Sequence, residues 1–134
     1  MILWKKVLSM AKYTTTFKNL IDMGFTTLVE QDENGNTDIQ QALALGGITN
    51  GVTPLELNAA YAAIANAGTY TEPILYTQIY DNLGNLLFEN TPATHTAMKD
   101  STAYLITSAM QDVVSKGTGT AAKLSGYVAA GKTG

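Results

Sequence analysis

A helix with both ends encoded in the sequence lies near the middle of the chain, in the segment GVTPLELNAAYAAIANAG. Thr53 is suited to the N-cap, because its hydroxyl can accept a hydrogen bond from an amide two or three residues later. Pro54 then occupies the first helical position, and Glu56 completes a capping box. Gly68 can adopt the left-handed conformation that ends a helix. The sequence therefore predicts a helix between Thr53 and Gly68.

Almost every residue between these caps is apolar, and many are alanine. A helix that is apolar on most sides is usually buried, and alanine lets neighbouring segments approach closely. We therefore expect this helix to lie at the centre of the core, with both Ala62 and Ala63 buried. The helix carries no candidate catalytic group.

Composition excludes several classes of function. The 134 residues include 8 Lys and Arg against 11 Asp and Glu, with no basic run, so no nucleic-acid partner is expected. The lack of cysteine excludes disulfides, thiolate metal sites and a cysteine nucleophile. His95 lies between two threonines and is interpreted as a surface residue rather than a ligand. We expect neither a metal nor a cofactor.

The same composition bears on membrane association. No apolar run approaches the roughly 20 residues that a membrane-spanning helix needs. Lysines interrupt the apolar residues of the segment 1–10, so it is not expected to be a signal peptide. These features predict a soluble polypeptide.

Periodicity and turn residues predict an α+β, mostly helical fold. Residues 91–98 are expected to be a connection, and residues 25–29 a strand or coil. The predicted helices cover 2–12, 14–23, 39–45, 100–116 and one turn at 120–124. The predicted strands are 74–80 and 85–88, which form a hairpin with a turn at 81–84, and 127–130.

The segment GYVAAGKT, from Gly126 to Thr133, matches the pattern of a nucleotide-binding P-loop. A P-loop needs a strand before its first glycine and a helix after its lysine, because the helix N-terminus helps to hold phosphate. Here the strand-like residues lie inside the motif, and Tyr127 and Val128 hinder curling of the backbone amides around a phosphate. Nucleotide binding in a small binding module is kept as the alternative hypothesis.

Two other patterns carry weaker signals. Ser9 and Lys12 form a Ser-x-x-Lys pair on one helix face, where the amine could take the serine proton, but no Ser-x-Asn accompanies them. Asp32, Asn34 and Asn36 have the spacing that opens a calcium loop, yet its sixth and twelfth positions lack the required Gly and Glu. We interpret these patterns as a surface pair and a polar turn.

The chain ends in Lys132-Thr133-Gly134. On a strand edge, these residues would offer an ammonium and a hydroxyl to a carboxylate, and the glycine would leave room for the backbone of a substrate. The tripeptide by itself is common and proves little.

In its context, however, the tripeptide is part of a longer resemblance. From Ala42 to Gly134 the chain resembles the later part of the transpeptidase domain of class A penicillin-binding proteins, and residues 2–30 are also similar to that family. The matching segments, in order, are ALALGGITNGVTPLELNAAYAAIANAG, YDNLGNLLFEN, STAYLITSAMQDVVSKGTGTAA and AGKTG. The family carries Ser-x-x-Lys, Ser-x-Asn and Lys-Thr-Gly motifs.

The resemblance implies a penicillin-binding-protein/β-lactamase-like fold and a peptidoglycan D,D-transpeptidase that works through an acyl-serine. Lys132 and Thr133 would be the catalytic residues of the Lys-Thr-Gly motif, and together with Gly134 they would bind the substrate. The partners of the parent protein would be peptidoglycan stem peptides and β-lactams. The parent would be membrane-anchored and extracytoplasmic.

The chain also departs from the family pattern. The resemblance places the family's Ser-x-x-Lys and Ser-x-Asn before residue 1, so Ser9 does not inherit the role of nucleophile. We expect residues 1–134 to be a partial transpeptidase domain that lacks the nucleophile half and the final strands, and to be inactive alone. The unpaired edge of residues 127–134 is expected to favour a homodimer.

Overall fold

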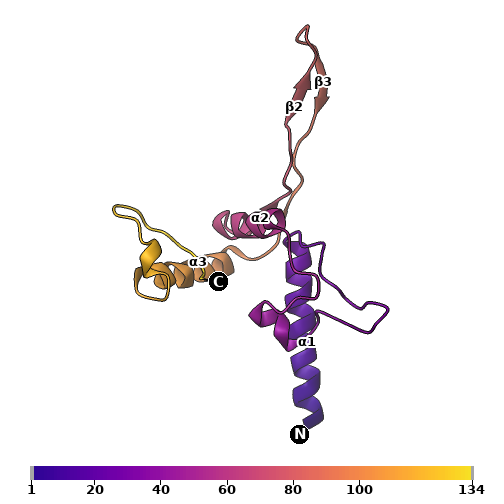
Figure 1. Ribbon diagram of the computed structural model, residues 1–134, viewed down its shortest axis with the longest axis vertical. Coiled ribbons are helices and arrows are strands. Elements are labelled where there is room, and N and C mark those ends of the chain that lie inside the picture. The colour runs from indigo at the N-terminus through magenta and orange to yellow at the C-terminus, as the bar shows by residue number, and fades with distance from the viewer. Residues whose placement is uncertain (1, 134) are drawn as a thin grey trace.

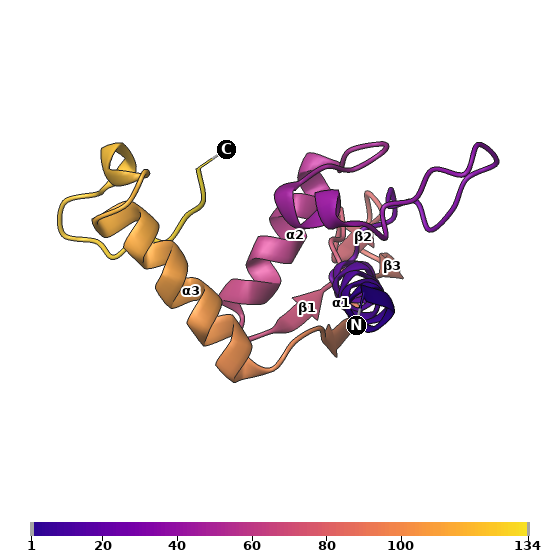
Figure 2. The same cartoon turned by 90° about the horizontal axis from the view of Figure 1, so that it is seen from below.

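The structure, a computed structural model, describes residues 2–133, with side chains described from Lys12 onward. Its α+β, mostly helical architecture confirms the predicted fold class. The elements are α1 (Ile2–Asp22), the 3-10 helix η1 (Gln41–Leu45), α2 (Pro54–Ala65), β1 (Thr69–Thr71), β2 (Gln78–Tyr80), β3 (Leu86–Glu89), β4 (Thr94–Thr96), α3 (Asp100–Ser115) and the 3-10 helix η2 (Thr120–Ala122). Helix α2 lies between α1 and α3, and the β2–β3 hairpin points away from all three (Figures 1 and 2).

The first helix corrects the sequence prediction. Two helices were predicted over 2–12 and 14–23, whereas α1 is continuous from Ile2 to Asp22. No Gly or Pro interrupts this segment, and β-branched residues lower helix propensity only slightly. Thr16 donates its hydroxyl to the carbonyl of Lys12 at 3.0 Å, so the hydroxyl is satisfied inside the helix.

The caps of α2 confirm the predicted start of that helix. Thr53 is the N-cap, its side chain accepts from the Glu56 amide, and Glu56 reaches back to the Thr53 amide. The helix ends at Ala65. Gly68 then has a φ of +88°, and a Cβ there would lie 2.2 Å from the carbonyl oxygen of Met98. Only glycine fits this junction without strain.

The expected burial of α2 on most sides is wrong. Ala59, Ala60 and Ala63 are buried, but Ala62 is exposed, and Leu55 is 56% exposed. The buried alanines form one face, on which two apolar clusters pack. One cluster joins Met23 and Phe25 to Ala60, and the other joins Ala59 and Ala63 to Tyr70. The small side chains are therefore used for close approach on one face only.

A pair of short strands was missed by the sequence analysis. Strand β1 pairs antiparallel with β4, and Tyr70 lies opposite His95. The segment 91–98 was expected to be a connection, yet its residues 94–96 form β4. His95 is exposed, as expected, and its Nε2 lies 2.6 Å from the carbonyl oxygen of Asp22 at the end of α1. This contact attaches the β1–β4 pair to α1.

The predicted hairpin is confirmed, although its first strand is shorter than predicted and its second is shifted by one residue. β2 pairs antiparallel with β3, and a bulge lies between Ile79 and Tyr80. Asp81 organises the turn by accepting the amides of Leu83 and Asn85 at Oδ1, each at 2.8 Å. No helix among residues 2–133 is both long and apolar enough to span a membrane.

The predicted strand at 127–130 is wrong for this structure, which has irregular backbone there. A strand is defined by ladder hydrogen bonds to a neighbour. Within residues 2–133, no segment pairs with 127–130, although its β-like residues are present.

Candidate functional site

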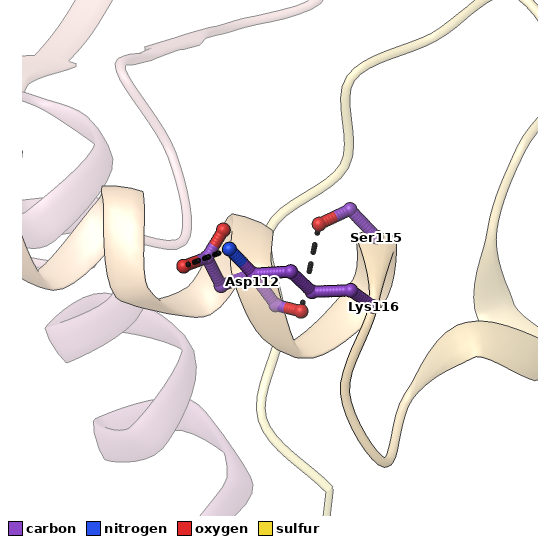
Figure 3. A network of polar contacts seen from close by, with 3 residues as sticks. All are labelled: Asp112, Ser115 and Lys116. Atoms are coloured by element: carbon purple, nitrogen blue, oxygen red, sulfur yellow. Dashed lines mark hydrogen bonds and ion pairs between the residues drawn. The ribbon is translucent and has the colours of Figure 1, made fainter.

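The C-terminal segment that contains Lys132 and Thr133 is held against helix α3. Ala103 and Val114 of α3 are buried. At the end of α3, the C-cap residue Lys116 forms an ion pair with Asp112 at 3.0 Å (Figure 3). Ser115 lies beside this pair, and its hydroxyl is 3.5 Å from the carbonyl oxygen of Asp112. Both ion-pair partners are solvent-exposed, so the pair contributes little stability.

Two glycines after α3 turn the chain sharply against the helix. A Cβ at Gly117 would lie 2.9 Å from the Cα of Val113, so a side chain there would collide with backbone. Gly119 is buried, and its amide donates to the Val113 carbonyl at 2.9 Å. The turn that holds Thr118 between these glycines is therefore fixed to the last turns of α3.

The C-terminal segment returns along the same helix (Figure 2). The amide of Gly131 donates to the carbonyl of Met110 at 3.2 Å. Two residues later, the hydroxyl of Thr133 lies 3.0 Å from the hydroxyl of Thr118. These two contacts fasten the Lys132-Thr133 segment to α3 and to the turn that follows it.

A small depression of about 80 Å³ lies at this contact. The residues that line it come from α3, from the segment that follows it, and from the C-terminal segment. They are Val113, Val114, Gly119, Ala122, Gly131, Lys132 and Thr133. The predicted site residues thus border a shallow, mostly apolar hollow.

The polar groups at this edge suit an anion. Lys132 is exposed, and its ammonium donates to the carbonyl of Thr133. Among residues 2–133, no side-chain carboxylate forms an ion pair with Lys132. An ammonium beside a hydroxyl can bind a carboxylate through charge-assisted hydrogen bonds. Gly134, the third predicted site residue, lies outside the described residues.

The Ser-x-x-Lys pair is not brought to this edge. Ser9 and Lys12 are on α1, whereas residues 131–133 lie beside α3, and both views separate the two regions (Figures 1 and 2). The side chain of Ser9 is outside the described set. A serine on α1 is therefore a poor candidate to work with Thr133.

The P-loop pattern does not have P-loop geometry. The backbone of residues 126–133 is irregular, and in the described part of the chain no strand leads into Gly126 and no helix follows Lys132. The helix N-terminus that would help to hold a phosphate is therefore not found at this motif. The structure offers no support for the nucleotide alternative.

The loop that half-matched a calcium motif is a turn, as the sequence favoured. Oδ1 of Asp32 accepts the amides of Asn34 and Asn36 at 2.9 and 2.8 Å, and Oδ2 accepts the Asn36 side-chain amide at 2.7 Å. The pKa of Asp32 is lowered, chiefly by this side-chain hydrogen bond. Within residues 2–133, no group of three or more His, Cys, Asp or Glu residues could hold a metal ion.

Glu56 has a role that sequence reasoning found only in part. The capping box was predicted, but Oε1 of Glu56 also accepts the amide and the hydroxyl of Thr26, each at 2.7 Å. Hydrogen bonds from the Thr26 and Thr53 amides lower the pKa of Glu56 from its ordinary 4.5 to about 2. The carboxylate borders a hollow of about 310 Å³, yet its hydrogen bonds join α2 to the segment after α1. This arrangement is structural.

Comparisons with known proteins agree on one family. The family model described as the penicillin-binding protein transpeptidase domain matches residues 8–134. Penicillin-binding protein 1A/1B of Bacillus subtilis is 40% identical over 99 residues, which cover 72% of this chain and 11% of that protein. Penicillin-binding protein 1A of Clostridium botulinum is 33% identical over 124 residues, which cover 86% of this chain and 15% of that protein.

A solved structure gives the same result. The crystal structure of the D,D-transpeptidase domain of a peptidoglycan glycosyltransferase from Eggerthella lenta matches with a TM-score of 0.67 and 25% identity. The match covers 91% of this chain and 36% of that chain. The chain thus spans only a small part of the length of its relatives.

Proposed function

The chain belongs to the penicillin-binding protein transpeptidase domain family, and on that premise we propose that it forms the carboxylate-binding edge of a peptidoglycan D,D-transpeptidase site. The observation that carries the proposal is the pair of side chains at residues 132 and 133. The ammonium of Lys132 and the hydroxyl of Thr133 lie on adjacent residues, on a segment fixed to α3 by the contacts of Gly131 and Thr133.

In the proposed reaction, a serine attacks the peptide carbonyl of a D-Ala-D-Ala stem terminus and forms an acyl-serine, and the terminal D-Ala leaves. The amine of a neighbouring stem peptide then takes the acyl group, which forms the crosslink and frees the serine. Lys132 and Thr133 hold the terminal carboxylate, and Gly134 leaves room for the substrate backbone. A β-lactam presents a similar carboxylate and would bind at the same edge.

These 134 residues are proposed to supply the binding edge and not the nucleophile. Ser9, the one serine in a Ser-x-x-Lys, lies on α1 and away from the segment that carries Thr133. A nucleophile has to be within hydrogen-bond reach of its base and close to the bound carbonyl. The 134-residue polypeptide alone is therefore inactive in this proposal.

We further propose where the protein works and how the isolated polypeptide associates. The natural partners are peptidoglycan stem peptides, which places the working protein at the bacterial cell envelope. The isolated polypeptide is proposed to form homodimers, because Tyr127 and Val128 are exposed on a segment that has no strand partner among residues 2–133.

The site proposal is tested in a chimera of penicillin-binding protein 1A/1B of Bacillus subtilis that carries this chain in place of the matching segment. The measurement is the rate of labelling by a fluorescent penicillin. We expect the chimera to be labelled, and Lys132→Ala and Thr133→Val each to slow labelling by about tenfold or more, the value of one lost charge-assisted hydrogen bond.

Lys123→Ala is the matched control, because it removes the same charge from the same C-terminal segment and Lys123 is outside the proposed edge. Labelling that is equally fast in Lys132→Ala, Thr133→Val and Lys123→Ala would refute the assignment of the binding edge. A chimera that folds, as judged by its thermal transition, but is not labelled would refute it as well.

A further inference from the structure

We infer that Thr118 is a positioning residue that orients the hydroxyl of Thr133 toward the substrate carboxylate. The inference rests on the proposed function of Thr133 and extends it to a residue that no sequence motif singled out. The two hydroxyl oxygens are 3.0 Å apart across 15 positions of sequence. Such a contact is a hydrogen bond of ordinary length between two hydroxyls.

The backbone around Thr118 is built to hold this contact. Gly117 and Gly119 flank it, and neither position has room for a side chain to be added freely. A Cβ at Gly117 would lie 2.9 Å from the Cα of Val113, and one at Gly119 would lie 3.2 Å from Val113 Cγ1 and 3.6 Å from Thr133 Cγ2. The turn is thus packed between α3 and Thr133, and the hydroxyl of Thr118 faces the hydroxyl of Thr133.

The direction of the hydrogen bond decides what Thr133 can do. A threonine hydroxyl has one donor hydrogen and two acceptor lone pairs. If Thr133 donates to Thr118, its hydrogen is used and the side chain offers only lone pairs to a carboxylate. If Thr118 donates to Thr133, the hydrogen of Thr133 is free for the carboxylate. A bound anion therefore requires Thr118 to be the donor.

A chain of two hydroxyls also strengthens the hydrogen bond that Thr133 donates to the substrate carboxylate. When Thr118 donates to Thr133, it polarises the second hydroxyl and makes it a better donor. Lys132, which precedes Thr133, supplies the positive charge at the same edge. Thr118 thereby sets both the rotamer and the donor strength of a residue that touches the substrate, without touching the substrate itself.

The test uses the 134-residue chain, labelled with ¹³C at threonine methyl groups, and compares it with Thr118→Val, Thr118→Ser and Thr133→Val. Three-bond couplings of the Thr133 methyl carbon report its χ1 rotamer. Titration with N-acetyl-D-alanyl-D-alanine, followed at the same signals, at backbone amides and at the Lys132 amine, reports binding. Thr102→Val, an exposed threonine early in α3, is the control.

We expect a single Thr133 rotamer in the wild type and in Thr118→Ser, and rotamer averaging in Thr118→Val. We also expect Thr118→Val to weaken dipeptide binding by about 3- to 10-fold, the range of one net hydrogen bond, and Thr118→Ser to stay within about twofold. Thr118→Ala replaces Thr118→Val if the valine lowers the thermal midpoint of the chain.

The outcomes separate the inference from the proposed function. An unchanged Thr133 rotamer and unchanged affinity in Thr118→Val, or in the Thr118→Ala that replaces it, would overturn the inference, even if Thr133→Val abolished binding and so upheld the binding edge. Averaging of Thr133 in Thr118→Val, together with a titration that Thr133→Val does not alter, would support the positioning contact and reject the proposed function.

Discussion

At the scale of single residues, carboxylates in this chain serve mainly to hold backbone in place. Asp38 is fully buried. Its Oδ2 accepts the Val29 amide at 2.8 Å, and its Oδ1 accepts the amide and hydroxyl of Thr49 at 2.8 and 2.7 Å. Burial by itself would raise the pKa of Asp38, but these hydrogen bonds outweigh it and the pKa is lowered. The carboxylate is therefore a buried junction between two loops.

We predict that Asp38→Asn destabilises the chain by about 1–3 kcal/mol. The new NH₂ group has to face either the Val29 amide or the Thr49 amide, and one buried donor then loses its acceptor. Asp32→Asn is the matched control, because the exposed Asn36 amide can flip to accept from the new NH₂. Denaturant unfolding measures both, and equal midpoints for the two variants would contradict the assignment.

We predict that Glu56 contributes to the pH dependence of the free energy of unfolding. Its pKa falls from an ordinary 4.5 to about 2 on folding. Because the folded pKa is the lower one, the stabilisation is fully present above about pH 4.5 and is lost as the pH falls toward 2.

Glu56→Gln should flatten the unfolding free energy against pH over that interval. The reason is that the glutamine side chain does not titrate in this interval and keeps only part of the contacts to Thr26 and Thr53. Urea midpoints at several pH values test this, and Glu33→Gln serves as the control on an exposed loop. A slope for Glu56→Gln identical to that of the wild type would mean that Glu56 is not held by these hydrogen bonds.

At the scale of elements, the sequence could predict what local signals encode. The start of α2 follows from Thr53, Pro54 and Glu56, whose interactions span three residues. The β1–β4 pair could not be found in the same way, because its register joins residues 23 to 27 positions apart and each strand is only three residues long. The alternation of threonine with Tyr70 and His95 was the one available signal.

The candidate site shows the same division between local and distant information. Lys132 and Thr133 were identified by a short motif within a longer family resemblance. The contact of Thr133 with Thr118 depends on how the chain turns after α3, which no motif states. The predicted strand at 127–130 failed because strand formation requires a partner, which lies outside the local sequence.

The one-sided burial of α2 gives a prediction for a matched pair of variants. Ala63 has 0% exposure and packs beside Tyr70, whereas the adjacent Ala62 is exposed. Ala63→Leu should cost about 1–3 kcal/mol through overpacking. Ala62→Leu should change the unfolding free energy by less than about 0.5 kcal/mol, as for other surface substitutions. Similar costs for both would show that α2 is buried on both faces.

At the scale of the whole molecule, apolar side chains remain exposed over several elements. The β2–β3 hairpin projects from the helices, with Phe88 61% exposed, and the C-terminal segment exposes Val128 at 84% (Figure 1). Exposed apolar surface of this extent marks sites of association. The related transpeptidase domain is about three times longer than the part matched here, since the match covers 36% of it.

We therefore predict that the isolated polypeptide self-associates, most simply as a two-fold dimer. Light scattering at several concentrations should show a mass that rises with concentration. Val128→Lys should lower the association, because a charge on an exposed edge opposes pairing, whereas Lys99→Arg keeps the charge and serves as the control. A constant monomer mass at high concentration would contradict the prediction.

The central claim is a division of roles, in which these 134 residues provide the Lys132-Thr133 edge and another part of the site provides the nucleophile. Intact-mass measurement after incubation with penicillin tests it directly, with the chain alone beside the chimera described above. We expect the chain to keep its mass and the chimera to gain one penicilloyl group. A stoichiometric adduct on the chain alone that Ser9→Ala removes would contradict the claim.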